Sequence, residues 1–351
     1  MKKILKFFLF LNIVLVIVTL FAYLSPYANP KHLWPVSVIA VFYPWLLLFN
    51  FIFIVFWMFN KFRYALISVA TILLGFNYLN GFIGFNSSGY MSSPDQIEIL
   101  SYNTQNLYYI YKTEENRKAR TDKFFKFMKD QHGVDIICAQ ELGLRSIELW
   151  NKKMKFPHVF APEKVGPVIF SNHPISDRGQ IHSEVSTINS CIWADISIKG
   201  TTYRIYNLHM ESNKITRTAE KVIEEVNLQN KETWSGVKAI IKRYKNNASL
   251  RIGHAERIRA HMLESPYPII LAGDFNDVPM SYLYHILSSG MNDSFIKKGR
   301  AFGTTFAGKI PALRIDYILT DSQFKILDHK IMKEGFSDHY PIKSVVQLKQ
   351  E

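Results

Sequence analysis

Acidic, amide and imidazole side chains follow short apolar runs at six places in the chain. They are Asn103, Glu141, His209, Asp274 with Asn276, Asp316, and Asp338 with His339. Carboxylate and amide oxygens suit a hard divalent cation such as Mg²⁺. Imidazoles and carboxylates also suit proton transfer. The chemistry open to such a set is therefore metal-assisted and acid–base catalysis.

Each cluster alone has a simpler interpretation. A polar residue after a buried strand often caps a helix or closes a turn, and for Asn103 or Glu141 alone this interpretation is at least as good. Gly273-Asp274-Phe275-Asn276 is less ordinary, because it places a carboxylate and an amide two residues apart on the same side of a strand end. Six such clusters in one chain favour a site over six unrelated turns.

Together these segments resemble the endonuclease/exonuclease/phosphatase superfamily, which has the fold of pancreatic-type deoxyribonuclease. The matching motifs, in the family's order, are S-Y-N-T-Q-N, A-Q-E, I-F-S-N-H-P-I, N-L-H-M-E-S, G-D-F-N-D-V-P, R-I-D-Y-I-L and S-D-H-Y-P. The resemblance extends from about Ile97 to Val346. It implies hydrolysis of a phosphate ester with a divalent metal.

The resemblance also implies roles for the acidic and amide residues. Glu141 is the expected ligand of Mg²⁺, with Mn²⁺ as the alternative ion, and Asn103 is a neutral oxygen partner. Asp338 either binds the metal or orients a water molecule. Asp274 is the expected base for the attacking water, and Asn276 would hydrogen-bond to the phosphate in the transition state.

The two histidines of the set have separate expected roles. His209 and His339 would flank the phosphate as donors, and Asp316 would bind the far nitrogen of His339 and fix its ring. The other nine histidines show no partner pattern, and we expect them at the surface or in packing. The sequence has no Cys/His cluster with zinc spacing, which argues against zinc.

The site residues must be positioned by short strands that helices interrupt. This pattern predicts an α/β sandwich of two stacked mixed β-sheets flanked by helices. Expected strands are 96–101, 134–138, 168–170, 191–198, 202–208, 268–272, 315–319, 324–329 and 342–348. Expected helices are 117–131, 214–244 and 251–264. Both cysteines, Cys138 and Cys191, fall in apolar strands, so buried free thiols are expected.

The first 94 residues differ sharply from the rest of this 351-residue chain. They contain no Asp or Glu and six basic residues, so the remaining 257 residues hold 36 basic and 29 acidic residues, a net charge of +7. We expect a transmembrane segment, 1–85, with three helices at about 4–24, 34–59 and 64–85. A linker, 86–94, and a phosphoesterase domain, 95–351, complete the expected organisation.

The short flanks of these spans predict an orientation. Lys2, Lys3 and Lys6 precede the first span and Lys61 and Arg63 follow the second, whereas only Lys31 lies between the two. The positive-inside bias then places the N-terminus in the cytoplasm and, after three spans, the catalytic domain on the extracytoplasmic side. A cleaved signal peptide is the alternative for the first span, although no convincing cleavage site follows it.

Three functions remain open at this stage. The first is a membrane-anchored phosphodiesterase or nuclease, because a basic domain suits a polyanion. The second is a hydrolase of lipid or inositol phosphates, which a membrane tether favours. The third is a catalytically inactive membrane scaffold, which six intact clusters disfavour. No protein partner is predicted.

Overall fold

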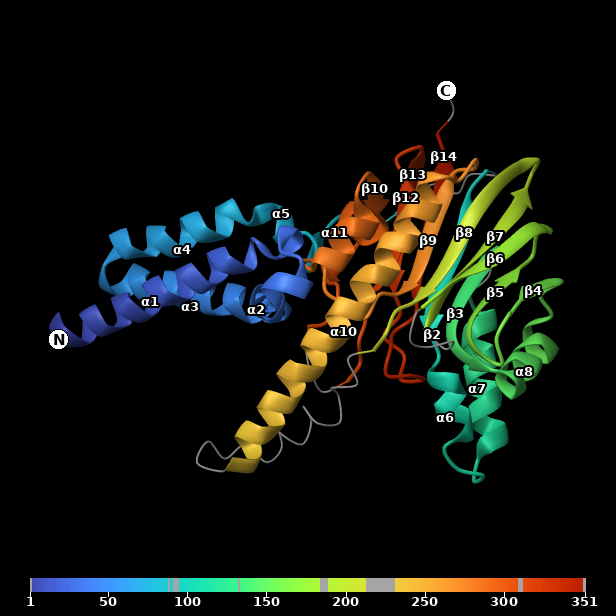
Figure 1. Ribbon diagram of the computed structural model, residues 1–351, viewed down its shortest axis with the longest axis horizontal. Helices are drawn as coiled ribbons and strands as arrows, with labels where there is room; N and C mark the ends of the chain where they lie inside the picture. The colour runs from blue at the N-terminus through green and yellow to red at the C-terminus, as the bar shows by residue number, and fades with distance from the viewer. Residues whose placement is uncertain are drawn as a thin grey trace.

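The computed structural model describes residues 2–87, 89–90, 95–131, 133–183, 189–212, 231–308 and 312–349. Two six-stranded sheets pack face to face, helices cover their outer faces, and the N-terminal helices extend to one side (Figure 1). The predicted sandwich of two mixed sheets is therefore confirmed.

The first sheet joins the first and last parts of the catalytic domain. In spatial order it contains β13 (Phe324–Ile331), β14 (Ile342–Leu348), β2 (Ile97–Asn103), β3 (Ile136–Gly143), β5 (Val165–Ser171) and β4 (His158–Phe160). Strands β2 and β3 run parallel, with Asn103 opposite Gln140, and their neighbours run antiparallel. The carboxyl ends of β2 and β3 therefore lie at one edge.

The second sheet repeats this arrangement. Its order is β10 (Met291–Asp293), β12 (Asp316–Asp321), β9 (Ile269–Asp274), β8 (Thr201–His209), β7 (Ser190–Ile198) and β6 (Ile175–His182). Strands β8 and β9 are the parallel pair, and β7–β8 is the predicted hairpin. The register places His209 opposite Asp274 and Asp274 opposite Asp316.

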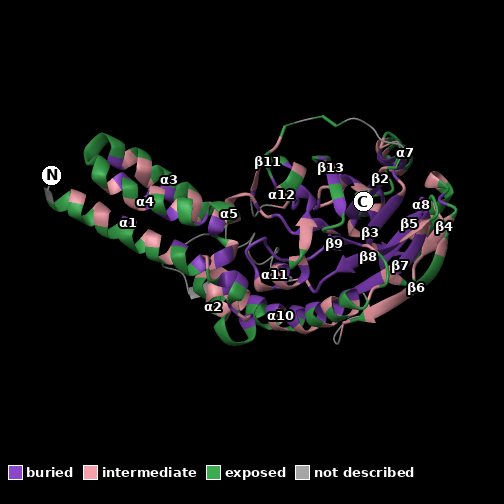
Figure 2. Ribbon diagram, turned by 90° about the horizontal axis from the view of Figure 1, so that it is seen from above, coloured by how far each residue is buried: buried purple, intermediate pink, exposed green. Residues whose placement is uncertain are grey.

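The core between the sheets consists mainly of β-branched side chains, as strands that pack face to face require. Ile99, Ile136, Ile205 and Ile270 are fully buried there. Figure 2 shows the strands of both sheets coloured largely as buried. Each outer face has its own apolar layer. Helices α7 (Arg117–Lys129) and α8 (Leu144–Met154) pack on the first sheet, while α10 (Lys231–Leu263) and α11 (Tyr282–Ser288) pack on the second.

Some helices differ from the prediction. Instead of a break near residues 245–250, α10 is one helix of 33 residues. Its sequence there has no proline and so nothing that must end a helix. Residues 214–230 of the predicted helix lie outside the described residues. Short elements that were not predicted include α6 (Tyr108–Tyr111), α12 (Ser294–Lys298) and β11 (Arg300–Phe302).

The N-terminal part is helical, but its helices do not follow the three expected spans, 4–24, 34–59 and 64–85. It contains α1 (Lys2–Ala22), η1 (Ser25–Tyr27), α2 (Pro30–Val41), α3 (Tyr43–Asn60), α4 (Phe62–Leu74), α5 (Phe76–Leu79) and β1 (Ile83–Phe85). Among the described residues, two stretches, Lys3–Tyr27 and Tyr43–Asn60, are long and apolar enough to cross a membrane, as a membrane helix or a signal sequence is.

Proline and glycine explain these differences. The second expected span is divided at Phe42, after which α3 begins at Tyr43 with Pro44 in its first turn, and the third ends at Gly75 after a helix of 13 residues. Residues 83–85 then form a strand with β11 instead of continuing a helix. The expected linker, 86–94, is described only in part, and Asn86 donates to the Gly299 carbonyl at 3.0 Å.

Candidate active site

The parallel strand pairs of both sheets end at the same edge, and their last residues contact one another. Asn103, the last residue of β2, donates to Asp274 Oδ2, at the end of β9, over 3.1 Å. Asn103 also donates to Glu141 Oε1 at 3.2 Å. The structure therefore brings residues from distant motifs into one cluster, which the family motifs imply but local sequence patterns cannot show.

Asp274 lies at the centre of this cluster. It accepts hydrogen bonds from the Asn276 backbone N–H at 2.8 Å and from the Asn276 side-chain amide at 3.1 Å. Burial raises the pKa of Asp274 to about 6, against the opposing charge of His339. Gly273 has φ +142°, and a Cβ there would collide with the Leu208 carbonyl, so only glycine brings Asp274 this close to β8.

His339 and Asp316 form a buried imidazole–carboxylate pair. The Nδ1 atom of His339 lies 3.0 Å from Asp316 Oδ2, and its Nε2 atom lies 3.7 Å from Asp274 Oδ2. Burial alone would lower the pKa of His339, but the facing carboxylates of Asp316 and Asp274 raise it to about 10. The His339 ring is therefore an imidazolium at neutral pH, with Nε2–H directed at the centre of the cluster.

Glu141 and His209 form the opposite side of the cluster. The two side chains approach to 3.4 Å, and the Glu141 side chain is 35% exposed whereas that of His209 is buried. Burial alone would raise the pKa of Glu141, but contact with His209 and Asn103 lowers it to about 2. Glu141 is therefore a permanently charged carboxylate that solvent can reach.

Asp338 lies beside the cluster rather than inside it. Its carboxylate accepts from Gln105 Nε2 at 3.2 Å and from Ser337 Oγ at 3.2 Å, and burial raises its pKa. Ser337 Oγ also lies 2.8 Å from the Asn103 carbonyl oxygen, to which it donates. Asp338 is therefore linked to the cluster through Gln105, Ser337 and Asn103.

Two groups could hold a cation. Among the described His, Cys and acidic residues, Asp274, Asp316 and His339 offer ligand atoms within 4.8 Å of one another. Asp316 and the Nδ1 atom of His339 already satisfy each other, so this group fits a proton-transfer pair better. Glu141 and Asn103 supply oxygen chemistry that fits Mg²⁺, provided that the Asn103 amide rotates, since its Oδ1 now accepts from Gln105 N at 3.1 Å.

Several supporting residues were not predicted. Thr305 Oγ1 accepts from the Asp316 backbone N–H at 3.1 Å, and the Phe306 ring packs edge-on against His339. Between the sheets, Gln140 Nε2 donates to Asn207 Oδ1 at 2.8 Å. These two amides belong to the N-L-H and A-Q-E motifs. Their sequence positions next to His209 and Glu141 were the signal that could have identified them.

Arg314 is another residue that was not predicted. It is fully buried and donates to Asp293 Oδ1 at 3.2 Å, and Asp293 in turn caps α12. Its guanidinium lies 4.7 Å from the Phe295 ring centroid. Arg314 therefore anchors the beginning of the strand that carries Asp316.

The remaining histidines and both cysteines fit structural roles. His173 contacts Asp135 at 2.7 Å, His261 contacts the Tyr206 hydroxyl at 2.8 Å, and His329 is buried against Ser294. His132 lies outside the described residues. Cys138 and Cys191 are free and buried, as predicted.

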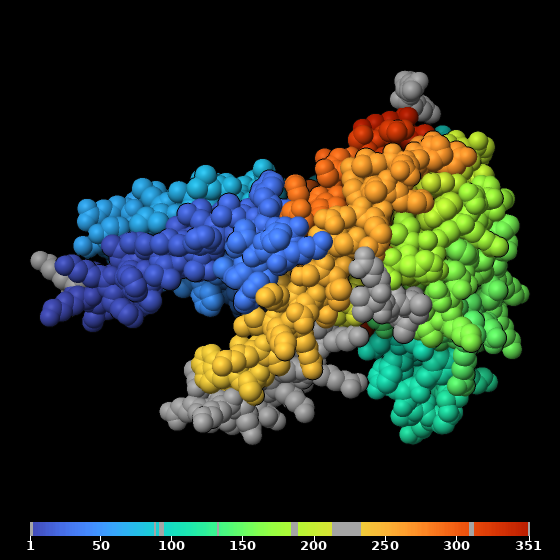
Figure 3. Space-filling model, viewed as in Figure 1, coloured from blue at the N-terminus to red at the C-terminus, as the bar shows by residue number. Residues whose placement is uncertain are grey.

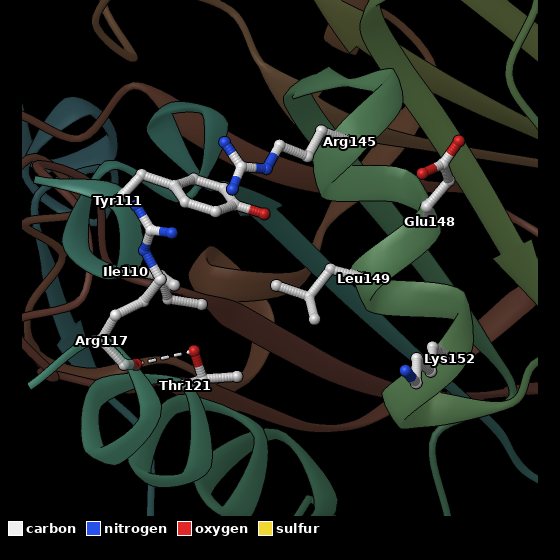
Figure 4. A pocket seen from close by; sticks show the side chains of 8 residues that line it. All are labelled: Ile110, Tyr111, Arg117, Thr121, Arg145, Glu148, Leu149 and Lys152. Atoms are coloured by element: carbon white, nitrogen blue, oxygen red, sulfur yellow. Dashed lines mark hydrogen bonds between the residues drawn. The ribbon is translucent and has the colours of Figure 1, made fainter. Parts of the chain in front are cut away.

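A basic recess of about 320 Å³ lies between α6, α7 and α8 (Figure 4). It is lined by Ile110, Tyr111, Arg117, Thr121, Arg145, Glu148, Leu149 and Lys152. The guanidinium groups of Arg145 and Arg117 lie 4.7 and 5.6 Å from the Tyr111 ring centroid. Arg145 is four residues after Glu141, so their Cα atoms are at most about 14 Å apart.

Comparison with solved structures shows the same fold. An endonuclease/exonuclease/phosphatase family protein from Bacteroides thetaiotaomicron is 18% identical over 74% of this chain and 100% of its own, with a TM-score of 0.54. D. rerio TDP2, complexed with single strand DNA product, is 15% identical over 72% and 99%, with a TM-score of 0.52. A mannosyl-6-phosphatase from B. thetaiotaomicron is 18% identical over 72% and 100%, with a TM-score of 0.50.

No curated protein matches the chain. Two family models do. One, described as "Domain of unknown function (DUF8431)", matches residues 5–82, which is the N-terminal helical part. The other, "Endonuclease/Exonuclease/phosphatase family", matches residues 100–339 and so covers all eight predicted site residues. The chain therefore belongs to the endonuclease/exonuclease/phosphatase family of metal-dependent phosphoester hydrolases.

Proposed function

We propose that this protein is a membrane-anchored phosphodiesterase that cleaves a nucleic acid strand with the help of Mg²⁺. One observation carries the proposal. The buried Asp274 carboxylate lies between the His339–Asp316 pair on one side and the Glu141–His209 pair on the other. The site therefore combines a base, Asp274, with hydrogen-bond donors and a solvent-accessible carboxylate, Glu141, that could bind a metal ion.

The residues divide the reaction between them. Asp274 accepts the proton of the attacking water. The Asn276 side-chain amide, which donates to Asp274 Oδ2 and the Met210 carbonyl, would exchange one of these two bonds for a bond to a non-bridging phosphate oxygen. His339 donates from Nε2, and Asp316 fixes its tautomer. Fixed donors of this kind stabilise the charge that develops on the phosphate in the transition state.

Glu141 and Asn103 are the residues that would hold the metal ion. A bound Mg²⁺ would polarise a phosphoryl oxygen and stabilise the leaving oxygen. Asp338, which Gln105 and Ser337 orient, would either bind the metal as a further ligand or orient a water molecule. Mn²⁺, which also prefers oxygen ligands, would occupy the same residues.

The basic recess supports a polyanionic substrate. Arg145, Arg117 and Lys152 outnumber the single acidic lining residue, Glu148, and Tyr111 offers a ring for base stacking. The net charge of +7 on residues 95–351 acts in the same direction. A neighbour of the same fold holds single-stranded DNA product.

A hydrolase of lipid or inositol phosphates is the second candidate. Large apolar side chains of α1, α3 and α4 are exposed, as contact with lipid requires, and they include Phe10, Phe51 and Leu74. An anchored site would then work close to phosphorylated headgroups. A sugar phosphatase of the same fold shows that the scaffold is not restricted to nucleic acid.

The test uses the full chain purified in detergent. Labelled single-stranded DNA and a phosphorylated lipid are offered in parallel, with Mg²⁺, with Mn²⁺ and with a chelator. We expect metal-dependent cleavage of the DNA, and a loss of at least about 10²-fold in Asp274→Ala and His339→Ala, since each removes a transition-state contact.

His173→Gln is the matched control, because His173 is also paired with a carboxylate but lies outside the site. Its rate should stay within about twofold of the unmodified protein. Turnover of the lipid alone would select the second candidate. Near-normal DNA cleavage by either site variant would refute the assignment of roles.

A further inference from the structure

The N-terminal helices pack directly on a loop of the active site. Their contact is an apolar cluster in which Tyr43 and Phe82 of the N-terminal part meet Val278 and Met280 of the catalytic domain, all four buried. Val278 follows Asn276 by two residues. The surface that receives the N-terminal helices is therefore the continuation of the Gly-Asp-Phe-Asn turn.

The same loop is fixed from its other side by the catalytic domain. Asp277 pairs with the buried Arg251 of α10 at 3.1 Å, and its carbonyl accepts from the Tyr317 hydroxyl at 2.8 Å. These bonds hold one end of the loop next to Asn276. The N-terminal cluster covers Val278 and Met280. The loop is therefore held on one side by the contacts of Asp277 and on the other by the N-terminal helices.

A second connection leads to the His339–Asp316 pair. The Phe82 carbonyl accepts from Gly303 N at 2.8 Å. The strand β11, which ends just before Gly303, pairs with β1. Two residues later, Thr305 binds the Asp316 backbone, and Tyr340 N donates to the Thr305 carbonyl at 2.7 Å. Phe82 thus contacts both segments that position the catalytic groups.

Further contacts join α2 to α10 along the same interface. The Tyr244 hydroxyl donates to the Ser37 carbonyl at 3.2 Å, Lys31 lies 3.7 Å from Glu256, and the Lys245 ammonium lies 5.7 Å from the Trp34 ring centroid. Figure 3 shows the blue N-terminal helices in contact with the gold α10 and the orange segment after it. A tether would need none of these contacts.

We propose that the segment matched by the domain of unknown function, residues 5–82, completes the active site. It seats two catalytic loops, 275–280 and 303–306, and thereby couples the state of the N-terminal helices to turnover. The proposal rests on the proposed function of the site but assigns the segment a positioning role beyond membrane attachment. Displacements of about 1 Å at a reacting centre cost about 10²-fold in rate, so such seating is a means of control.

The first arm of the test compares two phenylalanine truncations within the N-terminal part of the full chain. Phe82→Ala removes the ring that packs with Val278 and Met280 and keeps the carbonyl bond to Gly303 N, whereas Phe56→Ala removes a ring that packs on Phe8 and Trp57 inside the helical part. We expect kcat to fall about tenfold or more in Phe82→Ala with KM within twofold, and both constants to be unchanged in Phe56→Ala.

The second arm measures hydrogen exchange of the backbone amides in both catalytic loops. Phe82→Ala should exchange faster at 275–280, where its ring packs, and by less at 303–306, where the Phe82 carbonyl still accepts from Gly303 N, and Phe56→Ala should change neither loop. Phe82→Leu, which keeps an apolar side chain at this place, should shift the same amides by a smaller amount and covers the case in which Phe82→Ala does not fold.

The outcomes separate the two proposals. Unchanged exchange in Phe82→Ala and Phe82→Leu would overturn the seating role, whatever the substrate. Faster exchange in a protein that cleaves no phosphoester would keep the seating role and refute the proposed function. A fall in kcat of equal size in Phe56→Ala would show a general loss of structure and would also overturn the proposal.

Discussion

At the residue scale, the site depends on two buried groups with opposite protonation at neutral pH. Burial raises the pKa of Asp274 to about 6, and the carboxylates of Asp316 and Asp274 raise that of His339 to about 10. A base must have lost its proton and a donor must keep its proton. Between these two values, both groups are in the form that the reaction needs.

This difference predicts a bell-shaped pH profile. As pH falls through about 6, Asp274 gains a proton and the rate should fall, and as pH rises through about 10, His339 loses its proton and the rate should fall again. The measurement is kcat/KM from pH 4.5 to 11 at saturating Mg²⁺. His339→Gln should lose the alkaline limb and move the acidic one to higher pH, because the charge that opposes the rise in the pKa of Asp274 is removed, and an unchanged alkaline limb would assign it to another group.

Residue types and the order of the family motifs predicted eight site residues, whose catalytic roles stay predictions, but not the residues that support them. Asn103 and Glu141, and Asp316 and His339, contact one another as the motifs imply. Gln105, which binds Asp338 from 233 residues away, could not be found in this way. Such partners are set by how the sheets stack, and no local pattern records that.

At the element scale, α8 connects the proposed metal-binding side of the site with the basic recess. It begins directly after β3, which carries Glu141, and Asn106 Oδ1 accepts from both Gly143 N at 2.9 Å and Ser146 Oγ at 2.8 Å. Arg145 in the first turn is therefore held at a fixed place relative to Glu141. A neighbouring phosphate of a strand bound at the site would come within its reach.

Arg145→Ala tests this geometry. We expect KM for an oligonucleotide to rise about tenfold and the salt dependence of binding to weaken by about one unit of slope, because one charged phosphate contact is lost. A small phosphodiester without a second phosphate should keep its KM. Lys153→Ala, which removes a neighbouring cation that pairs with Asp122, is the control. An equal effect on both substrates would place Arg145 outside the binding surface.

The buried Arg314–Asp293 pair makes a prediction about stability. Arg314→Met leaves the Asp293 carboxylate buried beside the Tyr284 hydroxyl without its cation. We expect the free energy of unfolding to fall by about 3–5 kcal/mol, as for other broken buried pairs. Denaturant unfolding followed by tryptophan fluorescence measures it. Arg300→Ala breaks the exposed pair with Asp328 and should cost less than about 1 kcal/mol.

Helices and strands were predicted well where apolar residues recur at a clear period. The prediction failed where a single residue determines the end of an element. The hairpin β7–β8 and strand β9 follow their predicted ranges closely. The helix of the third expected span, 64–85, ends at Gly75. Residues 83–85 form β1 instead, because Gly84 packs against the Gly299 backbone of the catalytic domain. A hydropathy pattern contains no information about that partner, so the predicted helix was too long.

At the scale of the whole molecule, the N-terminal helices and the sandwich form one body. A mobile linker would make the N-terminal part a passive anchor, whereas the contacts of Phe82 and Tyr244 make it part of the catalytic scaffold. Removal of residues 1–94 would expose Val278 and Met280 beside the active site. Activity is therefore best measured on the full chain.

The same rigid connection makes the membrane orientation testable with single cysteines, because Cys138 and Cys191 are buried and should not react. Lys199→Cys lies in an exposed turn of the catalytic domain, and Lys61→Cys lies in the exposed turn between α3 and α4. The excess of Lys and Arg at the N-terminus and between α3 and α4 predicts that this turn is cytoplasmic. If the shorter apolar segment of α4 and α5 is the third crossing, a membrane-impermeant maleimide should label Lys199→Cys in intact cells and Lys61→Cys only after permeabilisation. The reverse pattern would place the catalytic site in the cytoplasm, and labelling of both cysteines in intact cells would mean that α3 and α4 do not enter the bilayer as proposed.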